Sequence, residues 1–135
     1  MTPRQIELVL TSHAAIRDDA TVIARFYELL FAAEPTARPL FQHLPATQSK
    51  FSEELDVLAS CLRDIDRFEA RALSLGARHR GYGVAPRHYA AASGALVQAL
   101  SEKLGAEFPV ESADAWRAAF DLVAETMMQG AQELA

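Results

Sequence analysis

The chain has 135 residues, a formal net charge of −5 and a composition that is 50% apolar and 23% charged. This length predicts one domain over residues 1–135 that can bury a core, and the composition excludes a disordered chain. The acidic balance, without a basic cluster, argues against a nucleic-acid partner, and no apolar run approaches the ~20 residues of a membrane span.

Cysteine usage and the N-terminus both favour the cytoplasm. Cys61 is the single cysteine, so it can form no intramolecular disulfide and offers no metal–thiolate spacing. The first residues, MTPRQIELVL, lack the basic and then apolar build of a secretory signal peptide. We therefore expect a cytoplasmic protein with no membrane partner.

Start signals predict the first two helices. Thr2 is a capping side chain, Pro3 stands just inside the helix and Gln5 completes a capping box. Either Asp18 or Asp19 can cap the second helix. The core-facing stripes at helical steps are Ile6, Val9, Leu10 and His13, and then Ile23, Phe26, Tyr27, Leu30 and Phe31.

The middle of the chain predicts a turn and two further helices. Pro35 ends the second helix, TARPLF (36–41) forms a short turn, and QHLPATQ (42–48) is a polar connection. Two helical stripes follow, at Phe51, Leu55, Leu58 and Leu62 and at Phe68, Ala72, Leu75 and His79. The steps of the second stripe place His79 on the apolar face of its helix.

Two more helices complete the pattern. Pro86 can open the first of them, Gly105 is its expected C-terminal cap, and Ser112 is expected to cap the second. Their stripes are Tyr89, Ser93, Leu96 and Leu100, and Trp116, Phe120, Val123 and Met127. No segment alternates convincingly with period two, so we expect an all-α fold with about six main helices plus a short one.

The common catalytic motifs are missing. The sequence holds no glycine-rich phosphate loop, no nucleophile elbow, and no paired-histidine or carboxylate-plus-histidine metal spacing. Chemistry must therefore come from isolated histidines and tyrosines. A histidine on an apolar face is more often a hydrogen-bonded core residue than a metal ligand, so spacing alone does not assign His79.

Four segments together resemble the bacterial single-domain haemoglobins. They are FYELLFAAEPTARPLF (26–41), LGARHRGYGV (75–84), PRHYAAASGALVQAL (86–100) and AWRAAFDLVAETM (115–127). The same segments resemble the globin domain of flavohaemoglobins and, more distantly, neuroglobin. They occur in the same order and at nearly the same separations, and the resemblance covers essentially the whole chain. This resemblance implies a globin fold around b-type haem, iron protoporphyrin IX. The 135 residues hold no flavin or nicotinamide domain, so we expect a protein similar to the single-domain members.

The resemblance assigns the two central residues. His79 matches the proximal histidine that ligates the haem iron, and its second ring nitrogen needs an acceptor, which we expect to be a backbone carbonyl about one turn earlier. Tyr27 matches the distal tyrosine, whose hydroxyl can donate to a bound gas and slow its loss about ten- to a hundred-fold. By residue type alone, Tyr27 is a core residue with its hydroxyl at the rim.

The resemblance also assigns the pocket wall. Phe41 matches the phenylalanine that packs against the porphyrin between the third helix and the distal helix. The remaining wall and haem-contact residues that we expect are Phe26, Phe31, Leu40, Leu75 and Val84. By residue type alone these are ordinary core residues, and a residue can both pack in the core and contact the haem.

The distal helix departs from the family pattern. A gapless count back from His79 places Thr47 where relatives carry a distal glutamine or histidine, and Phe51 faces the ligand one turn later. A slip of one residue would place Gln48 there instead, although one step turns a helical side chain by about 100°. The count favours Thr47. His43, in the polar connection, is a remote candidate for a sixth iron ligand, and its position favours the surface.

The proximal side departs as well. In the relatives a tyrosine and a glutamate contact the proximal histidine and make it more electron-donating. Tyr89 matches the tyrosine, but Ala131 stands at the glutamate position, between Glu125 and Glu133. A missing carboxylate weakens the push that favours O–O cleavage and oxidised iron, so we expect less peroxidase-like chemistry. Residues 81–83 are expected only to form the turn after the proximal helix.

Two functions follow from the resemblance. The first is reversible binding of oxygen, nitric oxide or carbon monoxide, for storage, transport or sensing. The second is nitric oxide dioxygenation, an enzyme activity that needs a separate reductase as partner. A haem-free helical interaction module is a third interpretation, against which the intact set of His79, Tyr27 and Phe41 argues. We expect gas binding by a monomer or a homodimer.

Overall fold

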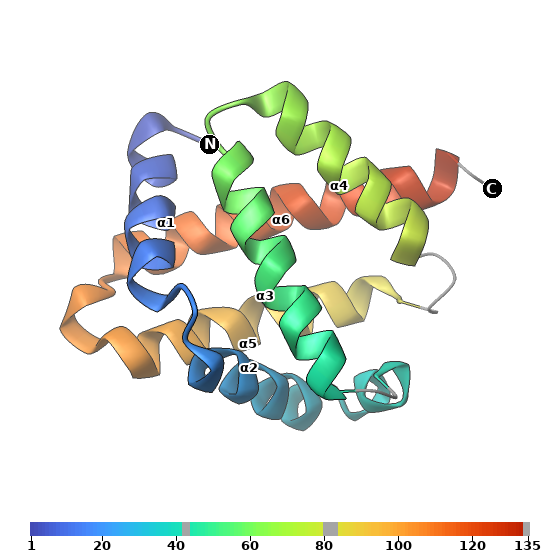
Figure 1. The fold of residues 1–135 in the computed structure, drawn as a ribbon, viewed down its shortest axis with the longest axis horizontal. Helices are drawn as coiled ribbons and strands as arrows, with labels where there is room; N and C mark the ends of the chain where they lie inside the picture. The colour runs from blue at the N-terminus through green and yellow to red at the C-terminus, as the bar shows by residue number, and fades with distance from the viewer. Residues whose placement is uncertain (42–43, 80–83, 134–135) are drawn as a thin grey trace.

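Figure 1 shows the computed structural model of the chain, which describes residues 1–41, 44–79 and 84–133, without the side chains of residues 44–47 and 133. These ranges hold six α-helices, two 3₁₀ helices and no strand. The elements are α1 (Pro3–Ile16), α2 (Ala20–Ala33), η1 (Pro35–Leu40), α3 (Leu44–Cys61), α4 (Ile65–His79), α5 (Pro86–Leu104), η3 (Gly105–Glu107) and α6 (Val110–Glu133). The expected all-α class is confirmed. Among the described residues, no helix combines the length and apolar composition of a membrane span.

The first two helices start at the expected signals. Thr2 accepts from the backbone N–H of Gln5 and donates its own N–H to the Gln5 side chain, which forms the capping box. Asp19, and not Asp18, caps α2 by accepting from the Thr21 N–H at 3.0 Å. Asp18 forms the turn before it with a φ of 65°, a left-handed conformation that aspartate tolerates better than most residues.

The start of α6 differs from the prediction. The helix begins at Val110, so Ser112 lies inside the first turn and is only 3% exposed. The carbonyl of Pro109 accepts from the N–H groups of Ser112 and Ala113 at 2.9 and 3.1 Å. The prediction of a Ser112 cap is wrong, because the Pro109 backbone opens the helix and buries the serine.

Two other element boundaries bear on the site. α3 begins at Leu44, inside the segment that was expected to be a polar connection, so Thr47 and Gln48 both belong to the helix. Gly105 ends α5 as expected, with a φ of 53° that favours glycine.

The helices pack in neighbouring pairs (Figure 1). α4 lies along α6, α2 lies along α5, and α1 packs against α6. α3 contacts α1, α2 and α4, and it crosses in front of α5 and α6 in this view. One large core fills the interior, and its largest fully buried side chains are Val22, Phe26, Phe68, Leu96 and Leu100.

The backbones of α4 and α6 approach each other at two glycines. A Cβ atom at Gly76 would overlap the carbonyl group of Met127, and one at Gly130 would overlap the carbonyl group of Leu73. Beside this crossing, Leu75 packs against Met127 in a small separate core. Because glycine has no side chain, the backbones of α4 and α6 can approach each other this closely at Gly76 and Gly130.

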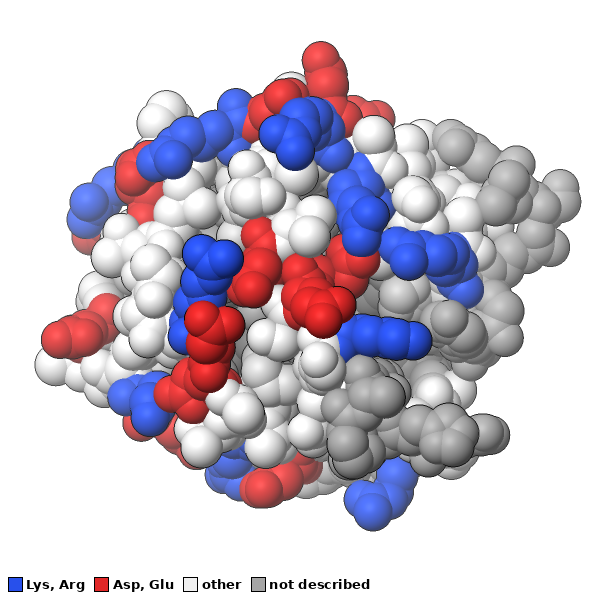
Figure 2. All heavy atoms as spheres, in the orientation of Figure 1, with Lys and Arg blue, Asp and Glu red and all other residues white. Residues whose placement is uncertain are grey.

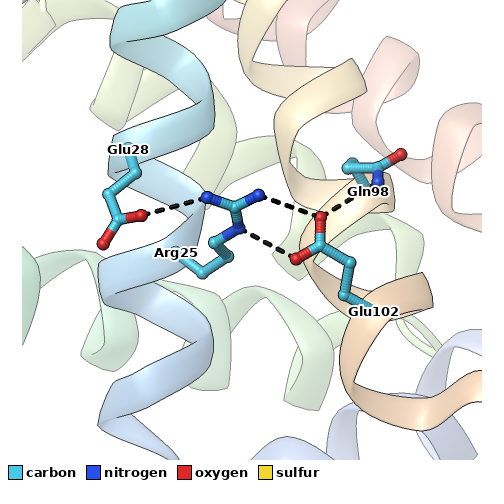
Figure 3. Close-up of polar contacts among 4 residues, drawn as sticks. All are labelled: Arg25, Glu28, Gln98 and Glu102. Carbon is cyan, nitrogen blue, oxygen red and sulfur yellow. Dashed lines mark hydrogen bonds and ion pairs between the residues drawn. The ribbon is translucent and has the colours of Figure 1, made fainter.

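Polar contacts join α2 to α5 at the surface (Figure 3). Arg25 donates from Nε to Glu102 at 2.8 Å and from Nη1 to Glu28 at 3.0 Å. Gln98 donates to the same Glu102 carboxylate at 3.0 Å. The Arg25 bond is the largest cause of a lowered pKa at Glu102. This network adjoins residues 26–27 and helps to hold that stretch of α2 on α5.

Charged side chains of both signs lie side by side on the face shown in Figure 2. Glu54 on α3 pairs with Arg71 and Arg78 on α4. On the other side of α3, Asp56 lies 2.8 Å from the Nε2 atom of the buried His13 on α1. These pairs join α3 to α1 and to α4.

Candidate functional site

His79 is the last residue of α4, and its ring is half-buried. Its Nδ1 atom lies 2.7 Å from the backbone carbonyl oxygen of Leu75. A carbonyl can only accept, so Nδ1 carries the hydrogen and donates it, as expected for an acceptor one turn earlier. This bond fixes the tautomer in which Nε2 holds the lone pair that a metal needs.

Burial keeps the imidazole of His79 neutral. Desolvation is the largest cause of its lowered pKa, and the positive charge of Arg78 acts in the same direction. The Leu75 hydrogen bond and the charge of Glu54 oppose this shift without reversing it. A neutral imidazole is the form that binds a transition metal without first losing a proton.

A pocket of about 190 Å³ lies beside His79, where α4, α5 and the end of α6 meet. It is lined by Gly76, His79, Val84, Pro86, Tyr89, Met128, Ala131 and Gln132. Three residues that the sequence assigned to this side, Val84, Tyr89 and Ala131, therefore share one pocket with His79. Burial raises the pKa of the Tyr89 phenol, which keeps it protonated and able to donate a hydrogen bond.

Glu125 does not replace the missing carboxylate in this pocket. It lines a different hollow of about 280 Å³ between α4 and α6, together with Phe68 and Glu69. The side chain of Glu133 lies outside the described residues. Among the described side chains of Glu125 and Ala131, only the methyl group of Ala131 lines the pocket with His79.

Tyr27 is 2% exposed and lies among four phenylalanine rings. The ring centroids lie 4.9 Å from Phe26, 5.2 Å from Phe41, and 5.9 Å from both Phe31 and Phe51. Burial raises the pKa of Tyr27 well above its usual range, so the phenol keeps its hydrogen. This burial agrees with the core position that the residue type alone indicates for Tyr27, but not with a hydroxyl at the rim.

The distal residues of α3 are described only in part. Phe51 stacks on Phe26 with centroids 4.6 Å apart and ring planes at 12°, so this stretch of α3 packs on α2. Gln48 is half-buried, and it lies three residues before Phe51 on the same helix. The side chain of Thr47, the residue His43 and the turn 81–83 lie outside the described residues, so the choice between Thr47 and Gln48 stays open.

Two features of this region were missed from the sequence. His88 is 6% exposed and holds the start of α5, a role that its position after Pro86 could have indicated. Gly76 and Gly130 stand inside helical patterns, where glycine signals a close backbone approach.

Comparison with known proteins identifies relatives over most of the chain. A family model described as Globin matches residues 24–127. Flavohemoproteins from Bacillus thuringiensis subsp. konkukian and Deinococcus radiodurans are 28% and 31% identical, over 95% of this chain and 33% of each relative. An uncharacterized globin-like protein from Aquifex aeolicus is 26% identical, over 95% of this chain and 92% of the relative. The chain thus spans about a third of the flavohemoproteins and nearly all of the globin-like protein.

Proposed function

Because this chain belongs to the globin family, we propose that it binds b-type haem through His79 and reversibly binds oxygen or another diatomic gas. The observation that carries the proposal is the hydrogen bond from His79 Nδ1 to Leu75, which leaves Nε2 as the donor atom for iron. Haem-based gas binding is the general function of the family, and when bound the haem supplies the iron at which the gas binds.

The residues present fit a haem. His79 offers a neutral nitrogen ligand at the end of α4, and the aromatic residues Phe41 and Phe51 offer apolar contacts to a porphyrin. Leu75 and Val84 are proposed to complete the contacts near His79, and Tyr89 to line the proximal side. These assignments rest on the donor chemistry of His79 and on the apolar surroundings of Tyr27.

Tyr27 is proposed as the hydrogen-bond donor to the gas. Its hydroxyl is protonated and shielded from water by the surrounding rings, and a hydrogen bond in such surroundings is stronger than in water. Thr47 or Gln48 is the second candidate on this side. The proposal therefore expects slow loss of oxygen, with most of the effect carried by Tyr27.

The surroundings of His79 favour gas binding over enzymatic turnover. Its Nδ1–H donates to a neutral carbonyl of the same helix, and a methyl group stands at Ala131. A carboxylate at either place would raise the basicity of the imidazole and favour oxidised iron. We propose a cytoplasmic monomer or homodimer that stores, transports or senses a gas.

Nitric oxide dioxygenation with a separate reductase is the alternative. The similarity to flavohemoproteins and the position of Tyr89 beside His79 are the observations that favour it. The two functions differ in turnover. Consumption of nitric oxide by the reduced protein with oxygen and a reductase would exceed one equivalent per haem only for the enzyme.

The first test is reconstitution with haemin, followed by absorbance and resonance Raman spectra of the ferrous protein. We expect His79→Gly to abolish the iron–histidine stretch and added imidazole to restore it, because imidazole can occupy the space of the lost ring. His13→Gly, which truncates another buried histidine, is the control and should keep the stretch. Unchanged coordination in His79→Gly would overturn the proposal.

A further inference from the structure

Next to the candidate site lies a buried histidine to which the proposed function assigns no role. His88 is 6% exposed and lies in the first turn of α5, directly before Tyr89. Its Nδ1 atom accepts the backbone N–H of Ala85 at 2.8 Å. Because Nδ1 is an acceptor, the neutral ring carries its hydrogen on Nε2.

The Nε2 hydrogen of His88 bonds across to η1. Nε2 lies 3.1 Å from the hydroxyl oxygen of Thr36, which therefore accepts. The Thr36 hydroxyl in turn donates to the carboxylate of Glu34. The three side chains form a directed chain of hydrogen bonds, from the start of α5 to the residue that precedes η1.

The charges around these three residues favour this order of donors and acceptors. The Thr36 hydrogen bond is the largest cause of a lowered pKa at Glu34, and the positive charge of the nearby Arg87 acts in the same direction. Arg87 Nε lies 3.8 Å from the Glu34 carboxylate and 3.5 Å from the Thr36 hydroxyl. Glu34 is thus an ionised acceptor at the end of the chain, paired with a cation.

The hydrogen bonds from His88 through Thr36 to Glu34 join the two sides of the candidate haem site. Their α5 end adjoins Val84 and Tyr89, which line the pocket beside His79. Thr36, their middle member, lies in η1, which leads directly into Phe41, whose ring packs edge-on against Tyr27. The Nδ1 bond caps the start of α5, whereas the Nε2 bond reaches a residue of another element, η1.

We propose that His88 is a positioning residue that, through Thr36, holds the proximal and distal walls of the gas-binding site in one arrangement. This inference rests on the proposed function. In the haem-bound protein, His88 then affects gas binding without touching the haem, because it sets where Phe41 stands against Tyr27.

Paired variants isolate the bond between His88 and Thr36. His88→Asn keeps an acceptor for the Ala85 N–H but is too short to reach Thr36, and Thr36→Val removes the other partner. Thr21→Val is the matched control, because its hydroxyl also donates to a carboxylate two residues earlier but bonds to no histidine in the described residues. The double variant tests whether the two changes remove one interaction.

Two readouts decide the inference. Long-range ¹H–¹⁵N spectra of the imidazoles should show the His88 hydrogen on Nε2 with or without haem, and a hydrogen on Nδ1 would overturn the inference. In the haem-bound protein, oxygen dissociation should accelerate about two- to ten-fold in His88→Asn, in Thr36→Val and no further in the double variant. The Thr21→Val rate should match the wild type.

The outcomes separate this inference from the proposed function. Wild-type rates in both variants, with an intact iron–histidine stretch, would overturn the role of His88 and leave haem binding in place. A wild-type protein that fails to take up haem through His79 would overturn both proposals.

Discussion

The distal and proximal sides of the candidate site are built in opposite ways. On the distal side, rings from α2, from α3 and from the residue after η1 surround Tyr27, which is 2% exposed. On the proximal side, His79 and Tyr89 are only half-buried around a pocket of about 190 Å³. The distal wall consists of aromatic rings, whereas the lining of the proximal pocket includes Gly76 and Ala131.

This difference predicts opposite responses to substitution. Truncation of a side chain should destabilise the distal side, because the loss of a buried ring leaves a cavity among the remaining rings. Enlargement should damage the crossing of α4 and α6, because its backbones leave no room for a side chain. Beside the crossing, the proximal pocket offers space for a larger side chain.

The largest expected effect is on the distal side. Phe26→Ala should lower the free energy of unfolding by about 3–5 kcal/mol, because it removes a fully buried ring that stacks on Phe51. Urea denaturation measures the loss. Phe68→Ala, which removes an equally buried ring from α4, should lose as much stability. A loss below about 1 kcal/mol in Phe26→Ala would show that the distal rings are loosely packed.

The next effect tests the helix crossing. Gly76→Ala should lower the free energy of unfolding by about 1–3 kcal/mol, because its Cβ meets the Met127 backbone. Gly94→Ala is the control, since nothing lies within 4 Å of a Cβ there and alanine favours a helix. Urea denaturation should show opposite signs for the two variants, and equal signs would contradict the close crossing.

Removal of one hydroxyl compares the two sides directly. Tyr27→Phe should speed oxygen dissociation about ten- to a hundred-fold, because the donor to the gas is lost. Tyr89→Phe makes the same change beside His79 and should alter that rate by less than about three-fold. Stopped-flow ligand replacement measures both rates. Equal effects of the two variants would contradict the proposal that Tyr27 donates to the gas whereas Tyr89 only lines the proximal pocket.

The smallest expected effect comes from a larger side chain at Ala131, which lines the proximal pocket. Ala131→Glu should place a carboxylate in the pocket that His79 and Tyr89 line, and lower the iron reduction potential by about 60 mV, a ten-fold preference for oxidised iron. Spectroelectrochemical titration measures the shift. Ala131→Gln has a similar shape without the charge and should change the potential little, so equal shifts would assign the effect to size.

The sequence predicts those features that depend on neighbours along the chain. Thr2 and Gln5 form their capping box, Gly105 ends α5, and His79 finds its acceptor one turn earlier at Leu75. Each of these depends on a few consecutive residues and on helical geometry. The resemblance likewise assigned Tyr89 and Ala131 to the side of His79, where both line its pocket.

Features that depend on distant partners escaped the sequence. His88 bonds to a threonine 52 residues away, and the role of Gly76 depends on where the Met127 carbonyl lies. Ser112 shows the same limit, because tertiary burial takes precedence over its preference for caps. The early start of α3 at Leu44 places both Thr47 and Gln48 in the helix, so local pattern alone cannot choose between them.

The position of His79 as the last residue of α4 has an electrostatic consequence. The aligned peptide dipoles of an α-helix place about half a negative elementary charge at its C-terminal end. The imidazole lies in that field, which favours positive charge on a ligated metal, as a nearby carboxylate would. With His79 as the proposed iron ligand, the helix itself would supply a weaker form of the electron-donating push that Ala131 cannot provide.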